Sequence, residues 1–140
     1  MSDAESLDGM STVEVRTSAT AALIPTIRAV ASDLAARADF DLDAISDLRM
    51  AVDEACATLV DAAEPTSVLQ CRFLVRPERI RVHAEVESAK PDTVLSTDTF
   101  GWRVLQTLAD DVAVEHSPGP DGAGPTVGIR LAKHAGDLPR

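Results

Sequence analysis

The chain has 140 residues, the length of one ordinary domain. Its 45% hydrophobic and 26% charged residues are typical of a globular protein rather than a disordered one. The 13 Lys and Arg against 23 Asp and Glu give a net charge of −10, which repels nucleic acid and anionic membranes, so we expect neither as a direct partner. The acidic N-terminus lacks the apolar segment of a secretory signal, and no apolar run is long enough to span a membrane, so we expect a cytoplasmic protein.

The first half of the chain predicts a strand followed by two helices. Residues 1–10 are small and polar, which predicts a disordered tail. Alternating apolar and polar side chains over residues 12–16 predict a strand. Helical spacing predicts a helix over residues 20–37, in which Pro25 loosens the first turn. Asp41 is placed to cap the next helix, which ends before Pro65. The apolar face of that helix consists of Leu42, Ile45, Leu48, Val52, Cys56 and Leu59.

The second half predicts four strands and one helix. Residues 68–75 and 80–86 predict a β-hairpin around residues 76–79. A loop over residues 88–99 leads to a helix over residues 101–108, with Trp102 as a core aromatic side chain. Strands over residues 112–114 and 126–132 flank a flexible turn at 117–125. We therefore expect one domain over residues 11–134, an α/β two-layer sandwich with helices on one face of the sheet, and a frayed tail over residues 135–140.

Glu54 is the candidate catalytic residue. It lies on the flank of the apolar face of the second helix, with Thr58 one turn later on the same side. A carboxylate in that position can act as a general base or hold a metal-bound water. A solvated charge on an amphipathic helix explains the same pattern.

Other chemistries find no support in the sequence. The histidines, His83, His116 and His134, do not pair at metal-ligand spacing, which argues against a zinc site. No P-loop, dinucleotide-binding or hydrolase motif is present. Cys56 and Cys71 each fall inside an apolar stretch, and we expect both to be buried and reduced.

Two segments carry a resemblance to a known family. Residues 47–58, Asp-Leu-Arg-Met-Ala-Val-Asp-Glu-Ala-Cys-Ala-Thr, resemble the N-box of serine-protein kinases and anti-sigma factors of the RsbW type, in the GHKL ATPase superfamily. Residues 101–112, Gly-Trp-Arg-Val-Leu-Gln-Thr-Leu-Ala-Asp-Asp-Val, resemble the segment that follows the second glycine box of the family. The resemblance covers residues 12–134 and extends in particular to actinobacterial anti-sigma-F factors. It implies the Bergerat fold, with helices on one face of a mixed, mostly antiparallel sheet.

The resemblance implies roles for four residues. Glu54 occupies the place of the general base, and Thr58 the place of the asparagine that coordinates magnesium. Gly101 fits the second glycine of the lid that covers the ATP phosphates. Arg28 matches an arginine of the first helix that contacts sigma in the family.

The chain departs from the family at three elements of the nucleotide pocket. The first departure is Thr58, which stands in place of the asparagine. The second is the absence of the Asp-x-Gly box, whose aspartate reads adenine in the family; only Glu87 or Asp92 could substitute for that aspartate. Thr99 stands where the first lid glycine is expected, and a β-branched residue opposes the close approach of backbone amides to phosphate. We therefore expect ATP and Mg²⁺ to bind weakly or not at all.

These features support three hypotheses about function. The first is an anti-sigma factor that sequesters a stress-response sigma factor, of the sigma-F or sigma-B kind, and is released by an anti-anti-sigma antagonist of the STAS class. Because sigma factors carry basic DNA-binding surfaces, a partner of charge −10 suits them. The second is an active serine/threonine kinase that uses ATP-Mg to phosphorylate that antagonist. The third is a structural domain with an accidental N-box. The resemblance further implies a homodimer.

Overall fold

The computed structural model describes residues 10–118 and 125–136. The strands are β1 (Ser11–Ser18), β2 (Val68–Arg76), β3 (Arg79–Val86), β4 (Asp111–Ser117) and β5 (Thr126–His134). The helices are the short 3-10 helix η1 (Ala21–Leu23), α2 (Ile24–Arg37), α3 (Leu42–Ala62) and α4 (Phe100–Leu108). Among the helices of these ranges, none combines the length and apolar character that a membrane crossing needs.

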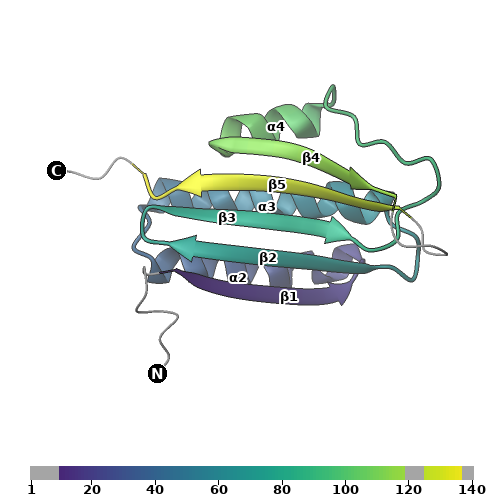
Figure 1. Ribbon diagram of the computed structural model, residues 1–140. Helices are drawn as coiled ribbons and strands as arrows, with labels where there is room; N and C mark the ends of the chain where they lie inside the picture. Colours follow the sequence, from purple (N-terminus) through teal and green to yellow (C-terminus); the bar gives the residue numbers. More distant parts are fainter. Residues whose placement is uncertain (1–9, 119–124, 137–140) are drawn as a thin grey trace.

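The strands form one sheet in the order β1-β2-β3-β5-β4 (Figure 1). All four neighbouring pairs are antiparallel. The helices cover one face of this sheet, which confirms the predicted two-layer α/β sandwich. The resemblance implied a mixed sheet, and in the described part of the chain the sheet is antiparallel throughout.

The core lies between the sheet and α3. Alternate residues of β2 and β3 point to the helices and are buried, as the period of two along a strand requires. On α3 the predicted apolar face is confirmed from Ile45, which packs against the core, to Leu59, whereas Leu42 is 83% exposed. Leu42 directly follows the N-cap, whereas Ala44 in the same turn is buried in the core. The core side chains that are shielded from water include Leu48, Val52, Leu59, Leu69, Phe73, Ile80, Val82, Ile129 and Leu131.

The predicted start of α3 is confirmed, whereas α2 starts at Ile24 rather than at residue 20 and α4 at Phe100 rather than at residue 101. The Asp41 carboxylate accepts a hydrogen bond from the Ala44 amide at 2.7 Å, so it satisfies one free N–H of the first turn of α3. Pro25 lies in the first turn of α2, preceded by the 3-10 turn of η1. Thr99 caps α4 by accepting from the Trp102 amide at 3.0 Å, and Trp102 is buried as predicted.

The two cysteines face each other across the core. Cys56 on α3 and Cys71 on β2 are both buried and free, with 3.8 Å between their sulfur atoms, which confirms their predicted burial. The pKa of the Cys56 thiol is raised, mainly by its hydrogen bond with Cys71 and secondly by its burial. A protonated thiol is a poor nucleophile, so Cys56 is unreactive in the folded state, and burial shields Cys71 from reagents.

Both chain ends and one turn lie partly outside the described residues. The predicted tail at 1–10 lies outside them except for Met10, and the predicted turn at 117–125 lies outside them at 119–124. The predicted tail at 135–140 begins too early, because Ala135 is buried and its carbonyl accepts from the Asp41 amide at 3.1 Å. Residues 137–140 are not described.

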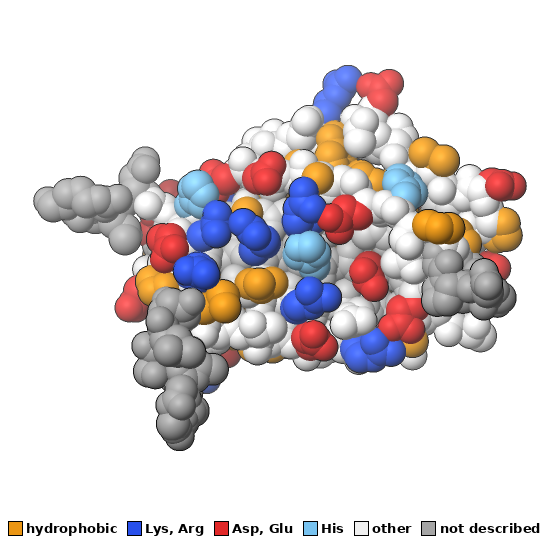
Figure 2. Space-filling model, viewed as in Figure 1, with side chains coloured by type: hydrophobic (Ala, Val, Ile, Leu, Met, Phe, Trp, Pro, Cys, Tyr) orange, Lys and Arg blue, Asp and Glu red, His pale blue; other side chains and the backbone are white. Residues whose placement is uncertain are grey.

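Figure 2 shows the second face of the sheet, which no helix of the described chain covers. Its side chains come from the alternate positions that point away from the core. We call this surface the open face. The outward positions that carry charge or an imidazole are Glu14, Arg16, Arg72, Arg76, Arg79, Arg81, His83, Glu85, Asp111, Glu115, Arg130 and His134.

Candidate functional site

The N-box helix α3 places Glu54 and Thr58 one turn apart. The Thr58 hydroxyl donates to the Glu54 backbone carbonyl at 2.9 Å and lies 3.3 Å from the Glu54 carboxylate oxygen Oε2. Both residues are partly buried. The hydroxyl bond to the preceding turn is the usual resting state of a threonine inside a helix. The structure therefore confirms that the two side chains lie together, as their spacing predicted.

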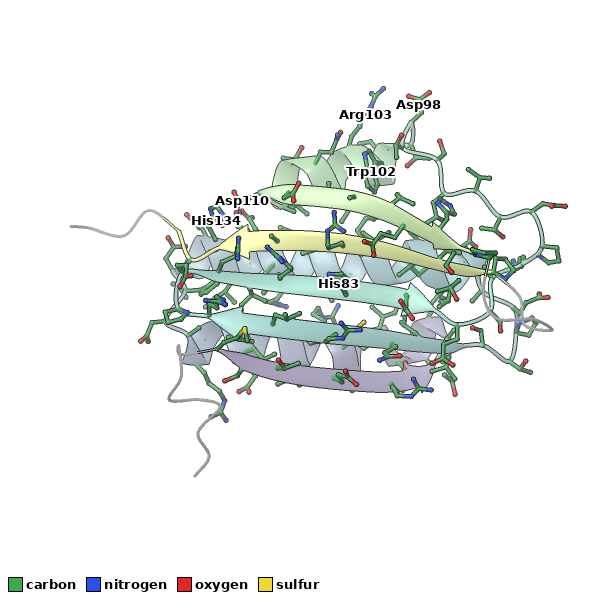
Figure 3. All side chains as sticks on the ribbon, viewed as in Figure 1. His83, Asp98, Trp102, Arg103, Asp110 and His134 are labelled. Atoms are coloured by element: carbon green, nitrogen blue, oxygen red, sulfur yellow. The ribbon has the colours of Figure 1, made fainter. Side chains whose placement is uncertain are left out.

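Helix α4 brings Gly101 against the Glu54 carboxylate. A Cβ atom built on Gly101 would lie 2.3 Å from Glu54 Oε2, so only glycine leaves room for the carboxylate in this position. Figure 3 shows the neighbouring α4 side chains: Trp102 points toward the sheet and Arg103 points away from it, beside Asp98. Three of the four predicted site residues, Glu54, Thr58 and Gly101, thus meet at the contact between α3 and α4.

Arg28, the fourth predicted site residue, pairs with a neighbour of Glu54. Its guanidinium donates to Asp53 Oδ2 at 2.9 Å, and the two side chains are 36% and 34% exposed. The other carboxylate oxygen, Asp53 Oδ1, is buried and has no hydrogen-bond partner among the described residues. The sequence indicated Asp53 only as part of the N-box, and its pairing with Arg28 joins α2 to α3.

A groove between α2, α3 and α4 contains both Arg28 and Glu54. Its volume is about 510 Å³, and its lining is apolar apart from Arg28, Asp53 and Glu54. The apolar lining residues are Ala21, Ile24, Pro25, Met50, Ala57, Val104 and Leu108. Met50 is 46% exposed although it is apolar. The residue predicted to contact a partner and the residue predicted to catalyse therefore line one groove, which we call the helix groove.

The candidates for the adenine-reading carboxylate lie elsewhere. Glu87 forms an ion pair with Arg16 of β1 at 2.6 Å, on the side of the open face. Asp92 is exposed in the loop after β3 and has a φ of 60°, the left-handed conformation that aspartate tolerates in turns. Lys90 holds the start of this loop against the end of α3, because its ammonium donates to the Asp61 carbonyl at 3.0 Å and its amide to the Ala62 carbonyl at 2.9 Å.

The residues present fit a bound ATP-Mg only in part. Glu54, Thr58 and Gly101 lie together, but Glu87 is engaged by Arg16 and the Thr58 hydroxyl by the backbone of its own helix. Over residues 10–118 and 125–136, no group of three or more His, Cys, Asp or Glu side chains is arranged to hold a metal ion. Thr58 would therefore have to ligate magnesium with few protein oxygens around it.

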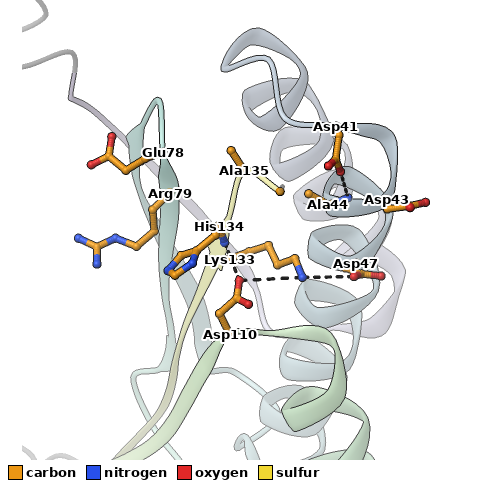
Figure 4. Close-up of a pocket in the computed structure, with 11 residues that line it drawn as sticks. Asp41, Asp43, Ala44, Asp47, Glu78, Arg79, Asp110, Lys133, His134 and Ala135 are labelled. Carbon is orange, nitrogen blue, oxygen red and sulfur yellow. Dashed lines mark hydrogen bonds and ion pairs between the residues drawn. The ribbon is translucent and has the colours of Figure 1, made fainter. Parts of the chain in front are cut away.

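A second hollow lies at the N-terminal end of α3 (Figure 4). Its volume is about 790 Å³, and it contains neither Glu54 nor Thr58. Lys133 crosses it, with its ammonium 3.2 Å from Asp47 and 4.0 Å from Asp110, and its side chain is only 14% exposed. Asp110 also accepts from the His134 amide at 2.7 Å. Asp110 thus ties the start of β4 to β5. The resemblance of residues 101–112 to the family segment did not reveal this structural role.

Comparison with known proteins places these features in a family. Residues 17–130 match the family of histidine kinase-like ATPase domains. The chain is 38% identical over 126 residues to the anti-sigma-F factor RsbW of Mycobacterium tuberculosis, in both strain CDC 1551 / Oshkosh and strain ATCC 25618 / H37Rv. The matched region covers 88% of this chain and 73% of each relative.

Proposed function

We propose an anti-sigma function for this chain, which belongs to the histidine kinase-like ATPase family and, within it, to the RsbW-type anti-sigma factors. The observation that carries the proposal is the 38% identity to an anti-sigma-F factor over 88% of the chain. In this proposal the chain holds a sigma factor of the stress-response kind and keeps it from core RNA polymerase. The chain is cytoplasmic, where sigma factors act.

The helix groove is the surface that we propose for sigma. It combines an apolar lining with one guanidinium and two carboxylates, so it suits an amphipathic segment that brings charges of both signs. A carboxylate of sigma would compete with Asp53 for Arg28, whose side chain is 36% exposed. The overall charge of −10 draws basic proteins toward the chain before contact.

We also propose that sigma binding does not need nucleotide. The Glu87–Arg16 ion pair, the threonine at position 58 and the non-glycine residue at position 99 support weak binding of ATP or none. Loss of a buried carboxylate that reads adenine costs about 1.5–3 kcal/mol, or roughly tenfold to a hundredfold in affinity. Release of sigma then falls to an antagonist of the STAS class that competes for the same chain.

Active kinase chemistry is the second candidate, and the meeting of Glu54, Thr58 and Gly101 favours it. Calorimetric titration with ATP and ADP in magnesium separates the two, followed by the same titration with purified sigma factor. We expect tight binding of sigma and little heat from nucleotide. A micromolar dissociation constant for ATP would instead support the kinase and indicate that Glu87 or Asp92 rebuilds the pocket.

The resemblance to the family also supports a homodimer, and we include it in the proposal. Sedimentation equilibrium of the purified chain tests it directly.

A further inference from the structure

One side of α4 carries a line of apolar side chains. Phe100, Val104 and Leu108 follow one another at intervals of four residues, so they lie along the same side of the helix. Val104 and Leu108 are half-buried and line the helix groove, whereas Phe100 lies one turn beyond them and is 83% exposed. The line therefore begins with an exposed aromatic ring at the start of α4 and continues into the helix groove.

Phe100 contributes little to the packing of its own helix. The side chains that bury α4 in the core are Trp102 and Leu105, on another side of the helix. The start of α4 is fixed by the Thr99 cap. A single exposed apolar side chain is common on protein surfaces, but one that is aligned with the wall of an apolar groove extends that groove.

Three helices supply the walls of the helix groove. Helix α3 lies between α2 and α4 on one face of the sheet (Figure 1). From α3, Met50 and Ala57 line the groove, and Met50 is 46% exposed. The path from Met50 to Ala57, or from Phe100 to Leu108, is about 10–12 Å long at a rise of about 1.5 Å per residue. The walls are therefore as long as about two turns of a partner helix.

The walls offer a partner no open strand to pair with, because every residue that lines the groove belongs to a helix. Amide and carbonyl groups in the body of a helix bond to one another. An extended segment laid here would bury its own N–H and C=O groups without partners, a cost that an α-helix avoids. A helix presents apolar side chains at positions i, i+4 and i+7, which fits the length of the groove.

We propose that the helix groove receives an α-helix of the sigma factor and that Phe100 anchors this helix at the α4 end of the groove. The inference rests on the proposed anti-sigma function and adds to it the form of the bound segment and its anchor. A carboxylate on the bound helix reaches Arg28 at the α2 wall, while its apolar side chains cover Met50 and Phe100. Large aromatic side chains dominate the affinity of many interfaces because each buries a large area at one position.

Charge favours sigma over a second copy of this chain as the occupant. The groove contains the carboxylates of Asp53 and Glu54 against the single guanidinium of Arg28. A second copy has a net charge of −10 and would bring further acidic side chains to this surface. Because sigma factors carry basic surfaces, a helix of sigma places positive charge beside the groove instead.

The chain offers a matched control for Phe100. Phe100 is the first residue of α4 and Leu42 is the first residue of α3, and both are 83% exposed. Polar Ser46 separates Leu42 from Met50 along α3, so no apolar line joins Leu42 to the helix groove. The two variants therefore remove equally exposed apolar side chains from equivalent helix positions, and only one of them alters the proposed surface.

Sigma-binding isotherms are measured for wild type, Phe100→Ala and Leu42→Ala. We expect the dissociation constant to rise at least tenfold for Phe100→Ala and less than twofold for Leu42→Ala. Circular dichroism should show the same fold for all three chains, and Phe100→Gln replaces Phe100→Ala if that variant does not fold.

Photo-cross-linking tests the form of the bound segment. The chain is prepared with p-benzoylphenylalanine at position 100 and irradiated with purified sigma factor, and the linked sigma peptide is identified by mass spectrometry. We expect a segment with apolar residues at spacings of three and four and with no proline inside it. A linked segment whose apolar residues alternate with polar ones would reject the helix.

The isotherms separate failure of this inference from failure of the anti-sigma proposal. If wild type does not bind sigma, the proposed function fails and the anchor with it. If wild type binds sigma and Phe100→Ala binds equally well, or if Leu42→Ala is weakened as much, the anchor is wrong while the anti-sigma function stands. Sedimentation equilibrium of the chain alone completes the test, because a change in self-association with no change in sigma binding would assign Phe100 to a contact between copies and overturn the proposal.

Discussion

Replacing Arg28 by alanine tests whether the helix groove holds sigma. In the free chain the Arg28–Asp53 pair is about one-third exposed, so solvent screening limits its contribution to folding to about 1 kcal/mol or less. A sigma segment seated in the groove would cover the pair and desolvate it. Truncating a covered charge pair costs about 2–5 kcal/mol in binding. Because Arg28 is already partly buried, we expect a loss of about 2 kcal/mol, or roughly thirtyfold in the dissociation constant.

The assay is a sigma-binding isotherm at two salt concentrations, with three controls. Arg37→Ala removes the same charge from the same helix at a position that is 76% exposed, so it measures the long-range electrostatic effect alone. Asp53→Asn frees Arg28 and should leave binding unchanged or tighter. Glu54→Gln should leave binding unchanged, because the family role of Glu54 lies in chemistry. If Arg28→Ala binds like wild type while Glu54→Gln fails, the reasoning is refuted and the N-box helix itself is the binding surface.

Three further predictions concern stability and reactivity. Gly101→Ala should change the free energy of unfolding by less than about 1 kcal/mol, because the added Cβ meets only the flexible tip of the Glu54 side chain. Gly128→Ala should cost about 1–3 kcal/mol, because its Cβ would lie 3.0 Å from a backbone carbonyl oxygen. Equal urea midpoints for the two variants would contradict this. Lys133→Ala should cost about 1–2 kcal/mol, because it leaves the partly buried Asp47 carboxylate without its cation. Arg37→Ala should cost less than about 0.5 kcal/mol. Both are measured by urea unfolding, and a reversed order would show that the Lys133 ion pairs contribute nothing. The two cysteines should react slowly with a thiol reagent in the native protein and completely on unfolding; rapid native labelling would argue against their burial.

Residues with a strong local pattern could be predicted from the sequence alone. The apolar spacing and the Asp41 cap located α3, because both signals lie within the helix itself. β4 extends from Asp111 to Ser117, longer than the predicted 112–114, because its outer residues are held by pairing with β5 rather than by their own alternation. Pairing with a neighbouring strand leaves no periodic signal in a segment such as β4, whose side chains are exposed or half-buried throughout.

The site shows the same limit. The Glu54–Thr58 contact follows from helical spacing and was predicted, whereas the approach of Gly101 to Glu54 depends on how α4 packs on α3. Arg28 was assigned to a partner by resemblance, and its bond to Asp53 appears only when α2 and α3 are packed together. Glu87 was a candidate for adenine, but the strand pairing of β1 brings Arg16 to it instead.

The most direct test of the anti-sigma proposal is competition for sigma. Labelled sigma-F-type factor is bound to core RNA polymerase in the absence of nucleotide, and the purified chain is added in increasing amounts. We expect the chain to remove sigma from core polymerase in proportion to its concentration, and Arg28→Ala to do so far less well. If sigma stays on core polymerase when the chain is present in large excess, the chain does not sequester it and the central claim is wrong.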